Sequence, residues 1–333
     1  MVLLSRVAQH AAAEVILLER SGFELVDHTA LDESANEDEV ISALAGAWAV
    51  VAGGERYSRR VIEALPTLRA IARTGIGFDA IDVAAATESG VAVIVTPGAN
   101  SESVADFALA LTLACLRGTI EADQAVRSGA WRPQNPAREL FGATVGVVGF
   151  GRIGQAFSRR LNGFGCRLLV VESAPDMDAC QRLGVELVSL DEMLPEVDVL
   201  SLHVPLTSDT RHLIGSRELH LMQPHAIVVN TSRGSVIDGS ALAEAIRNGV
   251  IGGAGLDVFE EEPLPATDGL LKLPGVVLAG HISSFTKEAM TRMMTSVSAS
   301  LAELAIGRTP STCINPDALT QTLTVAEGKA SDD

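Results

Sequence analysis

The chain has 333 residues, more than a single hydrophobic core usually supports, so its length predicts two domains. Apolar residues make up 47% of it, which argues against a disordered protein. The balance of 25 basic and 42 acidic residues gives a net charge of −17, so neither nucleic acid nor an anionic membrane is expected as a partner. No apolar run reaches the roughly 18–20 residues of a membrane-spanning helix.

The amino terminus, MVLLSRVAQH, lacks a basic segment followed by an apolar one, and we expect no signal peptide. The four cysteines show no close pairing motif, which predicts free thiols in a reducing, cytoplasmic compartment. No cluster of His, Cys and Asp has the spacing of metal ligands, so no metal site is predicted. The cysteines are Cys115, Cys166, Cys180 and Cys313.

The first hundred residues alternate short apolar runs with helical patterns such as AAAEVILLER, SRRVIEAL and DVAAATES. The runs are rich in Val, Ile and Ala without polar alternation, which is typical of parallel strands buried on both faces. This part therefore predicts an α/β unit. Its expected strands lie near residues 2–4, 23–26, 48–52, 68–72 and 91–95.

A long helix rich in Ala and Leu is predicted from Ser101 to Ser128, and a second strand–helix series starts at ATVGVVGFGRIG. That series predicts a doubly wound parallel sheet. A helix over 285–306 comes too late for it, and we expect this helix to return to the first domain. The tail from about residue 320 is expected to fray. The second sheet's expected strands are 144–148, 167–171, 185–188, 197–203, 226–231, 251–256 and 276–279.

Gly149, Gly151 and Gly154 form a GxGxxG sequence directly after an apolar strand and directly before a helix. The first glycine permits a tight turn, the second lets backbone approach a pyrophosphate, and the third lets the helix pack on the strand. With Arg152 and Ile153 between them, these residues are predicted to bind the phosphates of a dinucleotide at the helix N-terminus. The alternative is a structural glycine turn.

Glu172 ends the next strand, 18 residues beyond Gly154. A carboxylate at this place can accept both ribose hydroxyls of NAD and would repel the 2′-phosphate of NADP. No basic residue follows closely, because the next residues are Ser-Ala-Pro. The sequence therefore predicts NAD as the cofactor, and the alternative is an acidic residue placed there by chance.

Three ionisable residues follow strands of the second series: Arg233 after AIVVNTS, Glu262 in DVFEEEPLP and His281 at the end of VVLAGH. Ligands bind at the carboxyl ends of parallel strands. Arginine can hold a carboxylate, histidine exchanges protons near neutral pH, and a glutamate beside it orients the ring. Hydride transfer to a 2-keto acid needs these groups besides its cofactor. The alternatives are a structural salt bridge or a helix cap, and His203 is a weaker catalytic candidate.

Seven motifs follow one another along the chain: RTGIGFDAID, VTPGANSESVAD, TVGVVGFGRIG, HVPLT, NTSRG, GLDVFEEEP and AGHISS. In this order, over residues 48 to 316, they resemble the D-isomer-specific 2-hydroxyacid dehydrogenases. The resemblance implies that Arg233 holds the substrate carboxylate, that Glu262 orients the histidine and that His281 protonates the carbonyl oxygen. It also implies that Asp257 contacts the nicotinamide carboxamide.

The resemblance implies further site residues. The substrate is expected on the loop from Arg73 to Gly77, with contacts from Gly75, Ile76 and Gly77 and from Arg233. The chain departs from the family pattern at Asp106, where Glu is usual. It also departs on both sides of the histidine, at Ala279-Gly280 and Ser283-Ser284. Besides the glycine loop and Glu172, the residues implied to bind NAD are Val204, Thr231, Ser232, Arg233, Asp257, His281 and Ser284.

The fold that the resemblance implies has two doubly wound parallel-sheet domains. A flavodoxin-like substrate domain is expected from residues 1–99 and 285–333, and a Rossmann NAD-binding domain from residues 100–284. A homodimer formed through the long helix that begins near Ser101 is also implied. Hinges are expected near residues 97–101 and 283–285.

The motifs are most similar to those of D-3-phosphoglycerate dehydrogenases and of hydroxypyruvate or glyoxylate reductases. The favoured substrate pair is D-3-phosphoglycerate and phosphohydroxypyruvate, because residues 55–73 hold five arginines against two glutamates. Arg56, in the loop after WAVVAGG, is the candidate contact for the phosphate. The first alternative is a general reductase of small, anionic 2-keto acids, with Arg59 and Arg60 on a solvated helix face. The others are an NADH-sensing, corepressor-like binding protein and a formate or phosphonate dehydrogenase.

Overall fold

The computed structural model describes residues 2–4, 12–27, 35–131 and 136–320. These residues form two compact units, one from residues 1–100 with 284–333 and the other from 101–283. The chain thus crosses between the units at Asn100/Ser101 and at Ser283/Ser284, one residue from each expected boundary. The polar tail from residue 321, for which fraying is expected, lies outside the described residues.

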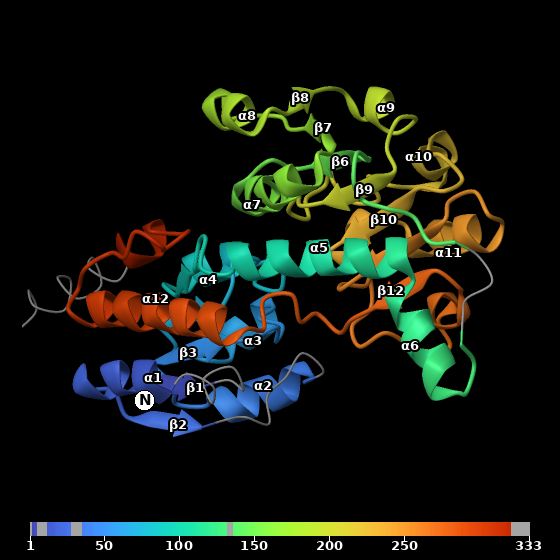
Figure 1. Cartoon of the computed structure of the whole chain (residues 1–333). Coiled ribbons are helices and arrows are strands. Elements are labelled where there is room, and N and C mark those ends of the chain that lie inside the picture. The colour runs from blue at the N-terminus through green and yellow to red at the C-terminus, as the bar shows by residue number, and fades with distance from the viewer. Residues whose placement is uncertain (1, 5–11, 28–34, 132–135, 321–333) are drawn as a thin grey trace, which may run out of the picture. The chain divides into compact units, whose positions relative to one another are not determined.

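The first unit is a five-stranded parallel sheet with helices on both faces (Figure 1). Its strand order, β2-β1-β3-β4-β5, is the flavodoxin-like order, as expected. The strands are β1 (Val2–Leu4), β2 (Leu25–Asp27), β3 (Ala49–Ala52), β4 (Ala70–Arg73) and β5 (Ala92–Ile94). The helices are α1 (Ala12–Arg20), α2 (Glu37–Leu44), α3 (Arg59–Glu63), α4 (Val83–Glu88) and α12 (Lys287–Ala305).

Apolar side chains decide which helices cover each face of this sheet. One face is covered by α2, α3 and α4, whose contacts include Val40, Val61 and Ala85. The other is covered by α1 and α12, which lie side by side and contribute Leu18 and Val297. Helix α12 therefore returns to the first unit, as the sequence predicts for the helix over 285–306. The central strands are buried on both faces, which explains their unbroken apolar sequence.

The second unit is a seven-stranded parallel sheet with the order β12-β11-β10-β9-β6-β7-β8. The chain starts in the middle at β6, winds outward to β8 and returns to β9, so the strand order reverses between β6 and β9. The strands are β6 (Thr144–Val148), β7 (Arg167–Val171), β8 (Glu186–Leu187), β9 (Val199–Leu202), β10 (Ile227–Asn230), β11 (Gly253–Leu256) and β12 (Val276–Leu278). This is the Rossmann order with one additional strand at the edge.

Helices cover both faces of the second sheet. One face carries α5 and α7, which pack against each other through Ala105, Ala108 and Phe157. The other carries α9, α10 and α11, with Met193, Leu219 and others in the core. The helices are α5 (Ser101–Arg117), α6 (Thr119–Arg127), α7 (Arg152–Leu161), α8 (Met177–Leu183), α9 (Leu190–Met193), α10 (Ser216–Leu221) and α11 (Gly239–Arg247), with short 3₁₀ helices at Asn162–Phe164, Gly234–Val236 and Gly269–Lys272.

The prediction of one continuous helix from Ser101 to Ser128 is wrong. Gly118 has a left-handed φ of 56°, which ends α5 at Arg117 and lets α6 leave at a bend of 61°. Glycine takes this conformation without the steric cost that other residues incur. Within the described ranges, no single helix is long and apolar enough to span a bilayer, and only the bent pair α5 and α6 together reaches that length and composition.

Candidate active site

The glycine loop is the tight strand-to-helix turn that the sequence predicts. Gly149 has a φ of 91°, and a Cβ there would lie 2.6 Å from the carbonyl oxygen of His203. A Cβ on Gly154 would lie 2.1 Å from the carbonyl oxygen of Gly149, so only glycine lets α7 approach β6 this closely. A Cβ on Gly151 would meet nothing within 4 Å. The backbone at Gly151 is therefore open to an approaching phosphate, as a dinucleotide site requires.

Glu172 lies beside this loop at the end of β7. Its Oε2 accepts the N–H of Phe150 at 2.7 Å, and its Oε1 accepts the N–H of Ala174 at 3.1 Å. Burial alone would raise the pKa of Glu172, but these backbone hydrogen bonds lower it below its ordinary value of 4.5. The carboxylate is therefore anionic at neutral pH. Its Oε1 also accepts the hydroxyl of Ser173 at 3.3 Å, whereas its Oε2 keeps a lone pair with which it can accept a ribose hydroxyl.

His203 follows β9 and is half-buried, with its carbonyl oxygen against the glycine loop. Its Nε2 lies 2.9 Å from Ser201 Oγ, and its ring packs on Phe157 with ring centroids 5.2 Å apart. Burial lowers the pKa of His203 to about 3. The ring is therefore neutral under physiological conditions, which supports a packing role over the alternative of catalysis.

His281 and Glu262 form a direct pair. His281 Nδ1 lies 2.8 Å from Glu262 Oε2, while Glu262 Oε1 accepts the N–H of Phe259 at 2.9 Å. Burial alone would raise the pKa of Glu262, but the hydrogen bond and charge of His281 and the nearby Arg233 lower it. A carboxylate on Nδ1 fixes the orientation of the imidazole and leaves Nε2 directed away from it. About a quarter of each side chain is exposed.

Arg233 lies on the turn after β10, and Asn230 builds this turn. Asn230 Oδ1 accepts both the N–H and the hydroxyl of Ser232, at 3.0 and 2.8 Å, and its Nδ2 donates to the carbonyl of Arg233 at 2.9 Å. Arg233 Nη1 donates to the carbonyl of Ser232 at 2.7 Å. A Cβ on Gly234 would overlap the backbone of Phe259, 1.8 Å from its carbonyl carbon, so the turn packs directly on the segment that leads to Glu262.

Asp257 holds the loop that carries His281. It is fully buried, and its carboxylate accepts the N–H of Ile282 at 2.8 Å and of Ser283 at 2.9 Å. Its own carbonyl accepts the N–H of His281 at 2.7 Å. His281 has a φ of 54°, which is rare and costly for a residue with a Cβ, and the surrounding hydrogen bonds hold it there. The expected contact of Asp257 with the nicotinamide remains a proposal.

The first unit contains the expected substrate loop, after β4. Thr74 fastens it to the end of β3, because its N–H and its hydroxyl both donate to the carbonyl of Ala52, at 3.1 and 3.0 Å. Arg73 Nε donates to the carbonyl of Gly77 at 3.2 Å and closes the loop. Within the described residues, the N–H groups of Gly75, Ile76 and Gly77 form no hydrogen bond. Consecutive available amides of this kind make a binding site for an anion.

The arginines between residues 55 and 73 do not form one basic patch. Arg59 pairs with Glu88 at 2.6 Å and with Glu63 at 3.3 Å, and Arg60 pairs with two acidic residues of α2. These pairs are exposed, as the alternative of a solvated helix face predicts. Arg56 is exposed and forms no ion pair within the part of the chain that is described.

The structure brings most of the predicted residues together in the second unit. Val204 contacts the glycine loop, since a Cβ on Gly149 would lie 2.9 Å from its Cγ1, and Thr231 and Ser232 belong to the Arg233 turn. Gly75, Ile76, Gly77 and Arg56 lie in the first unit, as does Ser284, the first residue after the second crossing. The role of Asn230 was missed, although a polar residue at the end of a buried strand is a signal for it. Among the described residues, no group of three His, Cys, Asp or Glu side chains could hold a metal ion.

The four cysteines are free, as predicted. Burial raises the pKa of the Cys115 thiol to about 12, so this sulfur is a weak nucleophile.

The comparisons with known proteins agree with this geometry. Residues 109–283 match the model of the family described as D-isomer specific 2-hydroxyacid dehydrogenase, NAD binding domain. A glyoxylate reductase of Korarchaeum cryptofilum is 47% identical over 262 residues, which are 77% of this chain and 79% of that protein. A glyoxylate reductase of Thermococcus litoralis is 44% identical over 274 residues, 80% of this chain and 82% of that protein.

Solved structures share the whole fold. D-Lactate dehydrogenase from Escherichia coli superposes with a TM-score of 0.82 at 32% identity, covering 94% of this chain and 99% of that one. The chain therefore belongs to the D-isomer-specific 2-hydroxyacid dehydrogenases, enzymes with a Rossmann NAD-binding domain, and it is an NAD-dependent member of that family.

Proposed function

We propose that the enzyme reduces a small 2-keto acid with an uncharged side chain, of the glyoxylate and hydroxypyruvate class, to the D-2-hydroxy acid. The observation that carries the chemistry is the His281–Glu262 pair, which lies on loops of an NAD-binding sheet. Relatives with 47% and 44% identity are named glyoxylate reductase, which supports this substrate class. The pairing of Arg59 and Arg60 with acidic residues supports it too, because little basic charge remains for a phosphate.

Each proposed catalytic residue has one task. When bound, the cofactor supplies the hydride for the keto carbon. His281 Nε2 donates a proton to the carbonyl oxygen, and the ring keeps its orientation because Nδ1 is held by Glu262. The anionic Glu262 stabilises the protonated imidazole before transfer. The Arg233 guanidinium binds the substrate carboxylate. The amides of Gly75, Ile76 and Gly77 are proposed as further anion-binding groups for the substrate.

The cofactor contacts are proposed in the same way. The amides at Gly151, Arg152 and Ile153 bind the pyrophosphate, and Gly149 and Gly154 give the loop its shape. Glu172 accepts the ribose hydroxyls. We propose that the nicotinamide end is lined by a further set of residues: Val204, Thr231, Ser232, Arg233, Asp257, His281 and Ser284.

A second candidate is D-3-phosphoglycerate and phosphohydroxypyruvate, the pair favoured by the sequence. One observation supports it: Arg56, in the loop after β3, is exposed and forms no ion pair within the described residues. Strand β3 pairs directly with β4, and the register places Ala52 opposite Arg73. Strand β4 leads into the proposed substrate loop. An arginine in the loop after β3 could therefore contact a phosphate on the part of the substrate beyond C2.

We also propose a homodimer and a cytoplasmic location. Four exposed apolar side chains between residues 120 and 141 support the dimer: Ile120 and Val126 are about half exposed, Trp131 is 78% exposed and Phe141 is 76% exposed. Such apolar exposure on one unit is typical of a protein interface. The four free thiols support a reducing compartment. Light scattering of wild type and of Trp131→Ser tests the dimer, which the substitution is expected to weaken.

A panel of keto acids tests the substrate. NADH oxidation is measured with glyoxylate, hydroxypyruvate, pyruvate and phosphohydroxypyruvate, with NADPH as the cofactor control. We expect kcat/KM for glyoxylate or hydroxypyruvate to exceed that for phosphohydroxypyruvate by at least about tenfold. A higher kcat/KM for phosphohydroxypyruvate than for glyoxylate or hydroxypyruvate would support the second candidate, provided that Arg56→Gln abolishes this preference and Arg59→Gln keeps it. NADH binding without turnover of any keto acid favours the NADH-sensing binding protein instead.

A further inference from the structure

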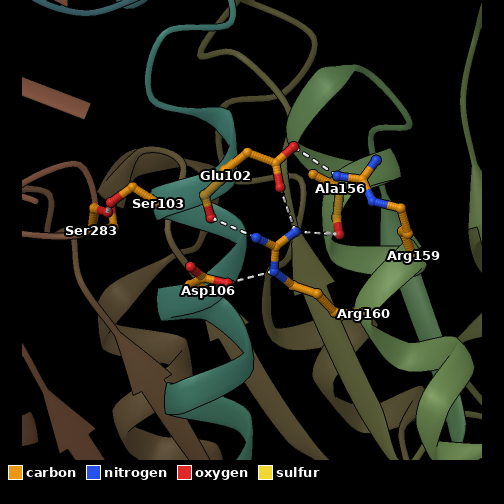
Figure 2. Close-up of polar contacts among 7 residues, drawn as sticks. All are labelled: Glu102, Ser103, Asp106, Ala156, Arg159, Arg160 and Ser283. Atoms are coloured by element: carbon orange, nitrogen blue, oxygen red, sulfur yellow. Dashed lines mark hydrogen bonds and ion pairs between the residues drawn. The ribbon is translucent and has the colours of Figure 1, made fainter. Parts of the chain in front are cut away.

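The first turn of α5 holds two distant parts of the second unit (Figure 2). The chain enters this unit at Ser101 and leaves it after Ser283. Figure 2 shows that Ser103 reaches Ser283, while Glu102 and Asp106 reach α7. One helical turn therefore contacts both the end of the histidine loop and the helix that follows the glycine loop.

Ser103 completes the anchoring of the histidine loop. Asp257 binds the N–H groups of this loop, as described above, and Ser103 Oγ donates to the carbonyl of Ser283 at 2.6 Å. Both serines are buried, with 5% and 4% of their surfaces exposed. The loop is therefore anchored from two elements: Asp257 directly follows β11, and Ser103 belongs to α5. Ser103 lies on a regular helix of 17 residues, whereas the loop that it holds contains the positive φ of His281.

Arg160, in the last turn of α7, holds the turn that carries Ser103. Its Nε donates to Asp106 Oδ1 at 2.6 Å, its Nη2 to the carbonyl of Glu102 at 3.1 Å, and its Nη1 to the carbonyl of Ala156 at 2.9 Å. Nη1 also lies 2.9 Å from Glu102 Oε2. Asp106 is thus long enough for this contact, although it is shorter than the glutamate usual in the family.

This guanidinium differs from a surface ion pair. The Arg160 side chain is only 18% exposed and is bound at four points, so little conformational freedom remains in the folded state. Arg159 adds a second contact to Glu102 at 2.7 Å. Helix α7 begins at the glycine loop. The same helix therefore borders the proposed cofactor site and holds the start of α5, which in turn holds the histidine loop.

We propose that Ser103 is a positioning residue for His281, and that Arg160 acts on His281 through the same turn. This inference rests on the proposed role of His281 as proton donor. Loss of the Ser103 hydroxyl leaves the carbonyl of Ser283 without its donor. The loop can then relax, and the distance over which Nε2 transfers its proton changes. NADH binding should be unaffected, because the glycine loop is intact.

The test separates positioning from general stability. We expect Ser103→Ala to lower kcat about tenfold, with the Kd for NADH and the KM for the keto acid within about twofold of wild type. Thr112→Val is the matched control, because Thr112 is a buried hydroxyl on the same helix that donates to the carbonyl of Ala108 instead. The control should keep its kcat. Equal losses in both variants, or an unchanged kcat in Ser103→Ala, overturns the proposal.

A second variant acts from the other side of the turn. Arg160→Met should also lower kcat, and the double variant with Ser103→Ala should lose less than the product of the two single effects, because both act through one turn. Arg167→Met is its control, since Arg167 also has two acidic partners but lies at the amino end of β7. If the fold-loss in kcat of the double variant equals the product of the two single losses, the two residues do not act through one turn.

His281→Ala, measured beside these variants, distinguishes the two levels of the argument. If it keeps its kcat, the proposed chemistry fails whatever Ser103→Ala does. If it loses activity while Ser103→Ala does not, only the positioning role fails.

Discussion

Two loops at the carboxyl ends of parallel strands are built in opposite ways. In the His281–Ser283 loop of the second unit, every backbone N–H is bound to Asp257. In the Gly75–Gly77 loop of the first unit, no N–H is bound within the described residues. The first loop presents a side chain, so its backbone must be fixed. The second leaves its amides available, as the proposed binding of an anionic substrate requires.

The largest effect should come from removing the side chain that the fixed loop presents. We expect His281→Ala to lower kcat about a thousandfold, which is within the range of a lost general acid. The Kd for NADH should rise by no more than about tenfold, because one of several proposed nicotinamide contacts is lost while the proposed phosphate and ribose contacts remain. Stopped-flow NADH oxidation and NADH fluorescence measure the two quantities. A kcat near that of wild type would show that the loop is fixed for another purpose.

The next effect should come from removing an amide that the open loop presents. Ile76→Pro takes away one N–H and should lower kcat/KM for the keto acid about a hundredfold, mainly through KM. Ile76→Ala is the matched control, because it keeps the amide and removes a side chain that is 41% exposed. If both variants lose activity equally, the loop acts through its side chain and the contrast between the two loops is wrong.

A third prediction concerns the pH dependence of the stability of the second unit. Burial lowers the pKa of His203 from 6.5 to about 3, so the unfolded chain binds a proton that the folded chain does not. Stability from this residue is complete above pH 6.5 and falls as the pH decreases toward 3.

Denaturant unfolding at several pH values measures this dependence. Between neutral pH and pH 5 the loss in the free energy of unfolding should be about 2 kcal/mol. His203→Gln keeps a partner for Ser201 but cannot titrate, and its curve should be flatter over this range. A parallel shift of the whole curve, without flattening, would show that His203 titrates normally in the folded protein.

The smallest effect should come from the arginines near the open loop. Arg60→Met removes exposed ion pairs to α2, and it should leave both the thermal midpoint and the KM for phosphohydroxypyruvate unchanged within error. A selective rise in that KM would instead assign α3 to substrate recognition.

The sequence predicts those parts of the site that depend on local chain chemistry. Gly149, Gly151 and Gly154 occupy the turn that their spacing predicts, and Glu262 reaches His281 although 19 residues separate them. The second result depended on the likeness to a known family, because spacing alone cannot show that two loops converge. Both strand orders also follow the expected pattern.

Sequence reasoning failed where the outcome depends on a partner far along the chain. For Arg59 and Arg60 the sequence left a basic patch and a solvated helix face open, and the acidic partners on α2 and α4 decide for the second. Ser103 resembles any helix residue until it meets Ser283, 180 residues later. The break at Gly118 failed for a different reason: a glycine within an Ala-rich pattern can be tolerated in a helix or can end it, and local sequence does not decide between the two.

The strand order of the second unit separates two kinds of change. Glu172, the proposed ribose contact, follows β7 on one side of the central strand β6. Arg233, Glu262 and His281 all follow strands on the other side. The proposed ribose contact and the proposed proton-transfer residues thus follow strands on opposite sides of β6. An engineer could therefore alter the preference between NAD and NADP on β7 without disturbing proton transfer.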